Sequence, residues 1–225
     1  MKTLKVILGV ALIATSIFIT SCSTKLKGDE AKVAEEQAVG SATGNEIAID
    51  TKMSKVGFTG NGVGKNHPGS FSLNSGTVNI ADGKLTGGNF IINAKSLVLD
   101  QKEEMFQTKL LGHLLGPDFL DAEKYPTAKF EITSVEPFAP SDKDTSVTPG
   151  ANYKISGNLT LKSITKNVTF PAKVEISSGV FTALASFNVD RKQWGIVYGN
   201  DKSLKDNFIS EVVNISLDIR SKQGI

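Results

Sequence analysis

Side chains suited to acid–base or metal chemistry are few in this chain of 225 residues. It has two histidines, His67 and His113, and one cysteine, Cys22. No carboxylates stand at a ligand spacing that would complete a metal site around them. Composition alone allows a Ser/His/Asp triad, but no Gly-x-Ser-x-Gly motif and no phosphate-binding glycine loop before a helix is present. We therefore expect that the protein is not an enzyme and that it holds no metal and no cofactor.

Cys22 ends an N-terminal segment that has the form of a bacterial lipoprotein signal. Lys2 and Lys5 precede an apolar run over residues 6–19, which the sequence Ile-Thr-Ser-Cys closes. This run is shorter than the roughly 20 apolar residues that span a membrane. We expect residues 1–21 to be removed and Cys22 to be lipidated, which would anchor the protein in the envelope, in the periplasm or at the outer membrane. The alternative is an ordinary secretory signal with an incidental cysteine.

Residues 22–44 have few large apolar side chains and no aromatic one, so they bury too little surface to offset the entropy lost on ordering. We expect a lipidated, flexible tether there, with at most a transient helix over 31–39. The remaining residues, 45–225, suit one domain with a sizeable core. Without residues 1–21, the 25 Lys and Arg residues fall to 23, equal to the 23 acidic residues. This balance gives no reason to expect a nucleic-acid partner.

Alternating apolar and polar residues predict β-strands over most of residues 45–220. The clearest pair covers residues 153–161 and 168–176, which a short polar turn joins into a hairpin. Asp82-Gly83 predicts a second tight turn. Gly76 and Gly87-Gly88 lie within strand-like runs and predict the bulges or bends that a closing barrel requires. Residues 137–151 are rich in Pro, Ser and Asp and predict a loop, whereas apolar spacing at about 102–115 predicts one or two short helices.

Three blocks of sequence, in order, resemble the YceI-like family of lipid- and polyisoprenoid-binding proteins. GNLTLKSITKNVTF at residues 157–170 is similar to the family's GdLTlkGvTkpvtf signature. DFLDAEKYPTAKF at 118–130 and DRKQWGIVYG at 190–199 resemble its dFfdvekyPtatF and DRt.yGi.Yg segments. The resemblance covers about residues 47–220 and departs from the family pattern at residues 60–66, beside His67. It implies an all-β fold, an eight-stranded antiparallel lipocalin-like β-barrel that encloses an elongated apolar pocket.

The resemblance also implies that the pocket holds a polyisoprenoid or another long-chain lipid. Small residues such as Gly157, Ala172, Ala183 and Ala185 alternate with large ones and leave room, although periodicity alone does not separate a hollow barrel from a filled one. The apolar side chains that we expect to contact the ligand are Phe58, Phe71, Phe90, Met105, Leu110, Leu114, Phe119, Phe130, Leu159, Phe170, Phe187 and Trp194.

His113 and Arg191 are the expected polar contacts of the ligand. Arg191 suits a phosphate-bearing headgroup, because a guanidinium binds phosphate through two parallel hydrogen bonds. The alternatives are packing or hydrogen bonding at the helix end for His113, and an ion pair or turn-fixing network for Asp190 and Arg191. The helix at 102–115 carries more apolar residues than one buried stripe requires. It either caps the barrel as core or forms a lid, with Met105 and Phe106 at the entrance.

The expected function is therefore transport, storage or sequestration of a long-chain lipid by an envelope protein. Two other classes remain open. One is an enzyme that acts on an isoprenoid or lipid, and the other is a structural or stress-related envelope module whose barrel is filled. Nothing in the sequence indicates the identity of the ligand, the membrane or the oligomeric state.

Overall fold

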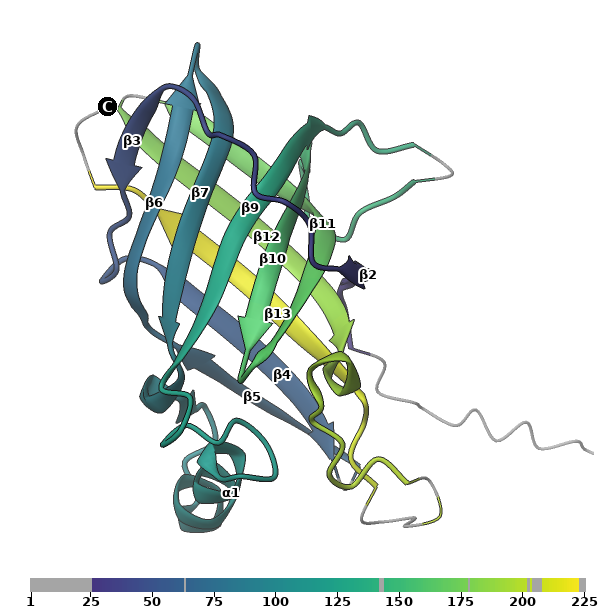
Figure 1. Ribbon diagram of the computed structural model, residues 1–225. Helices are drawn as coiled ribbons and strands as arrows, with labels where there is room; N and C mark the ends of the chain where they lie inside the picture. The colour runs from purple at the N-terminus through teal and green to yellow at the C-terminus, as the bar shows by residue number, and fades with distance from the viewer. Residues whose placement is uncertain are drawn as a thin grey trace, which may run out of the picture.

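The computed structural model describes residues 26–62, 64–141, 144–177, 179–201, 203 and 208–222. In these ranges the strands form one sheet that curls around an apolar interior (Figure 1). Its order is β3-β6-β7-β9-β10-β11-β12-β13-β4-β5-β8, with antiparallel neighbours throughout. The bounds are Asn45–Ala48 for β3, Lys55–Gly62 for β4, Lys65–Phe71 for β5, Leu73–Ala81 for β6, Lys84–Asn93 for β7, Val98–Leu99 for β8, Thr127–Pro137 for β9, Tyr153–Leu161 for β10, Ile164–Ser177 for β11, Val180–Asp190 for β12 and Val212–Arg220 for β13.

The curled antiparallel sheet confirms the all-β, lipocalin-like fold, with a small difference in strand number. β5 and β6 are separated by Ser72 alone. β5 pairs with β4 and β8, whereas β6 pairs with β3 and β7. The chain therefore bends at Ser72 from one part of the sheet to another.

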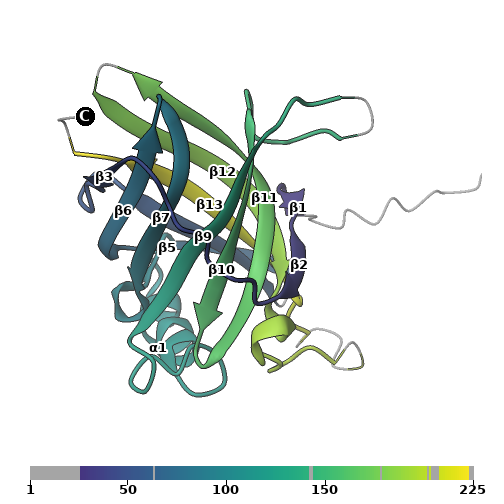
Figure 2. The ribbon, with the colours of Figure 1, turned by 45° about the horizontal axis from the view of Figure 1, so that its top comes forward.

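Backbone bonds at one end join β3, the first strand of the sheet order, to β13. Ile49, just after β3, forms an isolated bridge with Ser221, just after β13. The Asp50 amide donates to the Arg220 carbonyl at 2.8 Å, and the Lys222 amide donates to the Ala48 carbonyl at 3.0 Å. Figure 2 shows the result, with β6, β7 and β9 on one side of the interior and β12 and β13 on the other.

The β10–β11 hairpin confirms the strongest local prediction. Its register runs from Tyr153 opposite Ala172 to Leu161 opposite Ile164. Asp82 and Gly83, between β6 and β7, have φ values of 51° and 70°, the left-handed conformation that a two-residue hairpin turn favours. The register of β6 against β7 shifts between Asn79 and Ile80, next to Gly87, which confirms a bulge there.

Gly157 has a different role from the one that its size suggested. An added Cβ at this position would lie 2.3 Å from Cζ of Phe130 and 2.8 Å from the Glu131 carbonyl oxygen. The Phe130 ring therefore occupies the space above the glycine. Gly157 makes room for a neighbouring side chain, not for a ligand.

Helical structure covers residues 104–115, as the sequence predicts. It consists of a π-helical turn, η2 (Phe106–Leu110), and a short α-helix, α1 (Leu111–Leu115), which ends at Gly116. Two 3-10 turns, η1 (Ala94–Ser96) and η3 (Arg191–Trp194), lie at the same end of the sheet as α1 (Figure 1). Within the described ranges, no helix has the length and apolar composition needed to cross a membrane.

The prediction of a flexible tether is wrong for residues 26–37, and so is the transient helix over 31–39. Residues Asp29–Glu30 form β1, parallel to β12, and residues Lys32–Glu35 form β2, antiparallel to β11. Composition did not indicate that these residues form strands, because main-chain hydrogen bonds to an open strand edge need no large apolar side chain. The expected signal, residues 1–21, and the expected lipidation site, Cys22, lie outside the described residues.

Candidate ligand-binding cavity

A cavity of about 330 Å³ lies inside the curled sheet, and Leu110, Leu114 and Phe119 of the helical end also line it. This volume falls within the range of small-molecule pockets, roughly 300–1,000 Å³. Its walls are the inward-facing side chains of the long strands, because successive residues of a strand point to opposite faces. Among the described residues that line it, the ionisable side chains are His67 and Arg191. The arrangement therefore suits a guest whose enclosed part is uncharged and apolar.

Most of the side chains predicted to contact a ligand line this cavity. They are Phe58, Phe71, Phe90, Leu110, Leu114, Phe119, Phe130, Leu159, Phe170, Phe187, Trp194 and Arg191. Contact of these residues with a bound lipid stays a prediction.

Met105 and His113 are not among the cavity-lining residues, so their expected place at the pocket is wrong. The Met105 side chain is 57 % exposed, because it points away from the interior while Phe106 is buried. His113 Nε2 lies 3.1 Å from an Asp118 carboxylate oxygen. Its ring packs edge-on against Phe119 and Tyr198, with centroid distances of 5.0 and 4.7 Å. This environment matches the alternative of packing and hydrogen bonding at the helix end.

Four phenylalanine rings form a row across the cavity wall, from β7 through β9 and β11 to β12. Ring centroids are 6.3 Å apart for Phe90 and Phe130, and 5.9 Å apart for Phe130 and Phe170. Phe170 and Phe187 are stacked, with centroids 4.0 Å apart and an interplanar angle of 10°. Aromatic faces of this kind offer a large apolar contact area for a chain of methylenes or isoprene units.

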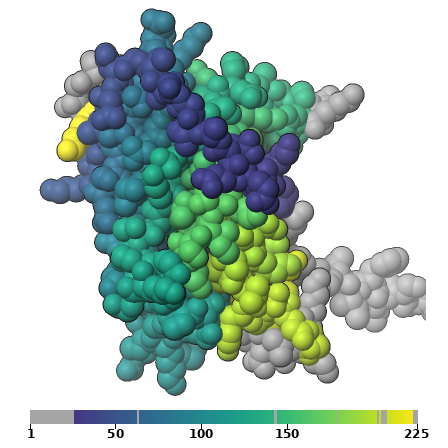
Figure 3. Space-filling view, viewed as in Figure 1, coloured from purple at the N-terminus to yellow at the C-terminus, as the bar shows by residue number. Residues whose placement is uncertain are grey.

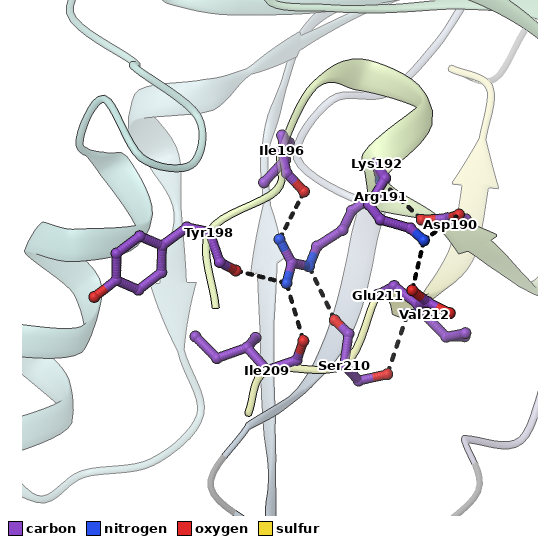
Figure 4. A network of polar contacts seen from close by, with 9 residues as sticks. All are labelled: Asp190, Arg191, Lys192, Ile196, Tyr198, Ile209, Ser210, Glu211 and Val212. Atoms are coloured by element: carbon purple, nitrogen blue, oxygen red, sulfur yellow. Dashed lines mark hydrogen bonds and ion pairs between the residues drawn. The ribbon is translucent and has the colours of Figure 1, made fainter. Parts of the chain in front are cut away.

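Arg191 fixes the loop between η3 and β13. Its guanidinium donates hydrogen bonds to four main-chain carbonyls, those of Ile196 (2.6 Å), Tyr198 (2.7 Å), Ser210 (2.9 Å) and Ile209 (3.0 Å), as Figure 4 shows. Burial lowers the pKa of this guanidinium from its usual value, and the nearby Asp190 and Glu211 carboxylates oppose that shift. An arginine remains charged in proteins at neutral pH. The contacts match the turn-fixing alternative, and headgroup binding by Arg191 stays a prediction.

Asp190 and Lys192 complete this network on the side facing solvent. An Asp190 carboxylate oxygen accepts a hydrogen bond from the Lys192 amide at 2.9 Å and so caps η3. The Lys192 ammonium lies 2.6 Å from a Glu211 carboxylate oxygen and 3.6 Å from one of Asp190. These pairs tie the start of η3 to the start of β13.

Trp194 and His67 anchor two further parts of the wall. Trp194 is 1 % exposed, and its indole N–H donates to the Leu159 carbonyl at 2.9 Å, which holds η3 against the β10–β11 hairpin. His67 Nδ1 lies 2.9 Å from the Gln101 side-chain oxygen, and its ring is 5.3 Å from that of Phe106. In the described ranges, no group of three or more His, Cys, Asp or Glu side chains is placed to hold a metal ion.

Sequence reasoning did not propose many of the remaining lining residues as ligand contacts. Alternation could have identified the strand positions, because they share a face with the predicted phenylalanines. Ile196, Ile209 and Ser210 lie in the irregular segment between η3 and β13, where no periodic signal exists. Strand residues of this kind include Val56, Leu73, Leu85, Ile92, Ile132, Ile155, Val168, Phe181, Val189, Ile215, Leu217 and Ile219.

A curled antiparallel sheet around an apolar cavity defines a lipocalin-like protein. Within this class, the chain belongs to the YceI-like family: the family model described as a YceI-like domain matches residues 48–221. The chain is 32 % identical to a UPF0312 protein of Pseudomonas putida (strain F1) over 130 residues, and 34 % identical to a UPF0312 protein of Yersinia pestis (strain Pestoides F) over 86 residues. The first alignment covers 57 % of each protein, and the second covers 38 % of this chain and 36 % of the relative.

Two solved structures share the fold. BcnA of Burkholderia cenocepacia superposes with a TM-score of 0.60 at 20 % identity, over 77 % of this chain and 99 % of BcnA. A polyisoprenoid-binding domain from Saccharophagus degradans, implicated in plant cell wall breakdown, gives a TM-score of 0.57 at 13 % identity, over 79 % of this chain and 98 % of that domain.

Proposed function

We propose that this protein binds a polyisoprenoid or another long-chain apolar lipid and transports, stores or sequesters it in the bacterial envelope. The observation that carries the proposal is the cavity of about 330 Å³, whose described lining is almost wholly aliphatic and aromatic. The Saccharophagus domain of the same fold is named for polyisoprenoid binding, which supports this class of ligand. Each methylene buried there would contribute about 0.8 kcal/mol, so ten would contribute about 8 kcal/mol before the entropy of binding is subtracted.

Binding without turnover fits the lining better than catalysis. The described lining residues include no carboxylate and no cysteine. Arg191 donates its hydrogen bonds to main-chain carbonyls, and His67 pairs with Gln101. General acid–base chemistry needs a titratable group within hydrogen-bond reach of the reacting atom. We therefore propose that the bound lipid leaves the cavity chemically unchanged.

A fluorescence titration with cis-parinaric acid, a fatty acid whose apolar polyene chain becomes bright when buried, tests the proposal. We expect saturable binding by the wild type and at least a tenfold loss of affinity in Ala185→Phe, because Ala185 lines the cavity and a ring would fill it. Thr182→Phe is the matched control, since Thr182 lies on the same strand but not in the cavity lining. Equal binding by both variants, or none by the wild type, would contradict the proposal.

We also propose that Cys22 carries the membrane anchor. Because residues 26–37 are held on the sheet, the anchor and the folded protein would be separated by residues 23–25 alone. Four peptide units from Cys22 to Leu26 reach at most about 14 Å. The protein would therefore lie close to the membrane surface and not at the end of a long tether.

Cys22→Ser is expected to move the protein from the membrane fraction to the soluble fraction, or to stall processing at the precursor mass. Ser23→Ala, one residue further on, should leave the partition unchanged. Membrane fractionation and intact-mass spectrometry check this expectation. An unchanged mature mass and unchanged partition of Cys22→Ser would show that the anchor is not on Cys22.

A further inference from the structure

The wall of the cavity has a split between β11 and β12. These strands pair only from Lys173 opposite Leu184 to Ser177 opposite Val180. Over residues 164–172, β11 pairs with β10 and runs apart from β12, which pairs with β13 up to its last residue. Pro171 has no N–H to donate to a ladder, and it lies two residues before the pairing with β12 begins. The cavity-lining residues that flank the split are Val168 and Phe170 on one side and Phe187 and Val189 on the other.

Residues 26–37, here called the N-terminal strap, fill this split. β1 pairs with Phe187 and Asn188 of β12, and β2 pairs with residues 166–169 of β11. Ala31 and Val33 are partly buried and pack against the core. Figure 3 shows the N-terminal segment in purple lying across the surface of the molecule. The strap thus acts as the missing strand of the wall.

Buried asparagines on the outer side of the sheet hold the strap by its main chain. The Asn158 side chain accepts from the Gln37 amide at 3.1 Å and donates to the Gln37 carbonyl at 2.7 Å. Asn188 donates to the Gly28 carbonyl at 3.2 Å, and Asn214 donates to the Lys27 carbonyl at 3.0 Å. These asparagines are 3 %, 2 % and 8 % exposed, and the strap supplies part of the hydrogen bonds that satisfy their covered amides, beside those from neighbouring strands.

Behind the strap, the stacked rings of Phe170 and Phe187 bridge the split from the cavity side. The helical end of the cavity is held together by other contacts. There Arg191 binds four carbonyls of its own loop, and His113, Phe119 and Tyr198 form one aromatic cluster. The strap is a peripheral segment with few apolar contacts, and such segments open at lower free energy than the packed core.

We propose that the split between β11 and β12 is a lateral portal for the ligand, and that the N-terminal strap is its removable cover. Displacement of the strap, with rotation of the Phe170 and Phe187 rings, opens a slot between two strands whose cavity-facing side chains are apolar. A long, thin apolar chain passes through such a slot lengthwise. This inference rests on the proposed lipid-binding function. It places the entrance in the side wall of the sheet and not at the helix over 102–115, which the sequence allowed as either a lid or a core cap.

A disulfide that locks the strap to β11 tests the portal. Thr169 lies opposite Lys32 of the strap and also opposite Ser156 of β10. Directly paired residues of antiparallel strands have the Cα separation that a disulfide needs. The test variant is Lys32→Cys/Thr169→Cys, and the matched control is Ser156→Cys/Thr169→Cys, both in full-length Cys22→Ser protein. We expect oxidation to slow cis-parinaric acid uptake about tenfold in the test variant, to leave the control unchanged, and to be reversed by reduction.

A second test uses one variant that loosens the strap and one matched control that does not. A Cβ at Gly28 would lie 2.3 Å from Asn214 Nδ2 and 2.5 Å from Asn188 Oδ1, whereas the nearest atom to a Cβ at Gly40 is 3.9 Å away. Gly28→Ala should therefore accelerate uptake several-fold, and Gly40→Ala should not. If neither the disulfide nor Gly28→Ala changed the uptake rate while equilibrium binding stayed intact, the portal would be overturned and the proposed function would stand. Absence of equilibrium binding in every reduced variant would overturn both.

Discussion

Replacement of Arg191 by methionine is expected to lower the free energy of unfolding by about 4 kcal/mol. The side chain is 5 % exposed and satisfies the carbonyls of Ile196, Tyr198, Ile209 and Ser210. Methionine fills much of the volume but donates no hydrogen bond. Each carbonyl that stays buried without a donor costs about 1–3 kcal/mol, and water that enters the loop recovers part of this cost. Denaturant unfolding followed by circular dichroism measures the change.

Two comparisons separate this explanation from a general effect of charge. Lys192→Met removes the neighbouring cation, but its ammonium pairs with Glu211 at the surface, so the change should be much smaller. Arg191→Lys keeps the charge, yet one ammonium does not reproduce the planar fork that spans four carbonyls, so it should rescue little stability. Equal losses in Arg191→Met and Lys192→Met would contradict the role of Arg191 in fixing the loop.

Phe170→Ala is expected to cost about 3 kcal/mol of stability, near the lower end for a buried phenylalanine because the ring already borders empty volume. It should also change which ligands bind. Phe170 is 2 % exposed, stacks on Phe187 and lines the cavity. Its removal enlarges the cavity beside the phenylalanine row, so bulkier apolar chains should bind more tightly relative to cis-parinaric acid. Competition of a series of prenols against cis-parinaric acid measures this preference.

Phe138→Ala is the matched control for this substitution. Phe138 is also buried, at 8 % exposure, but it is not among the described residues of the cavity lining. Its truncation should reduce stability and leave the order of prenol affinities unchanged. If Phe170→Ala kept the wild-type order as well, the cavity would not be the site that selects the ligand.

The alternation of side chains predicted the strands and the inward-facing phenylalanines, whereas the curled sheet around a pocket was implied by the family resemblance. Phe58, Phe130, Phe170 and Phe187 line the cavity because inward and outward positions of a strand alternate regardless of tertiary detail. Met105 was misplaced because apolar spacing in a short helix does not say which residue faces the core. The π-helical turn at Phe106–Leu110 also changes the angle between successive side chains.

Other features depend on contacts between residues far apart in the sequence. The N-terminal strap binds through main-chain groups and short polar or small side chains, so its composition resembles that of a disordered segment. Arg191 could be identified as important from its sequence block, but the carbonyls that it binds come from residues 196–210, which carry no regular pattern. Whether small residues leave a hollow interior depended on packing: the Phe130 ring fills the space above Gly157, and a cavity remains elsewhere.

Organic extraction of the protein purified from a bacterial envelope, followed by mass spectrometry, tests the central claim most directly. The account predicts that a polyisoprenoid or another long-chain lipid is recovered from the wild type in nearly equimolar amount. Ala185→Phe, purified in the same way, should retain much less of it, because the introduced ring occupies the cavity. A folded wild type that yields no more lipid than Ala185→Phe would contradict the account and favour a structural envelope module without a ligand.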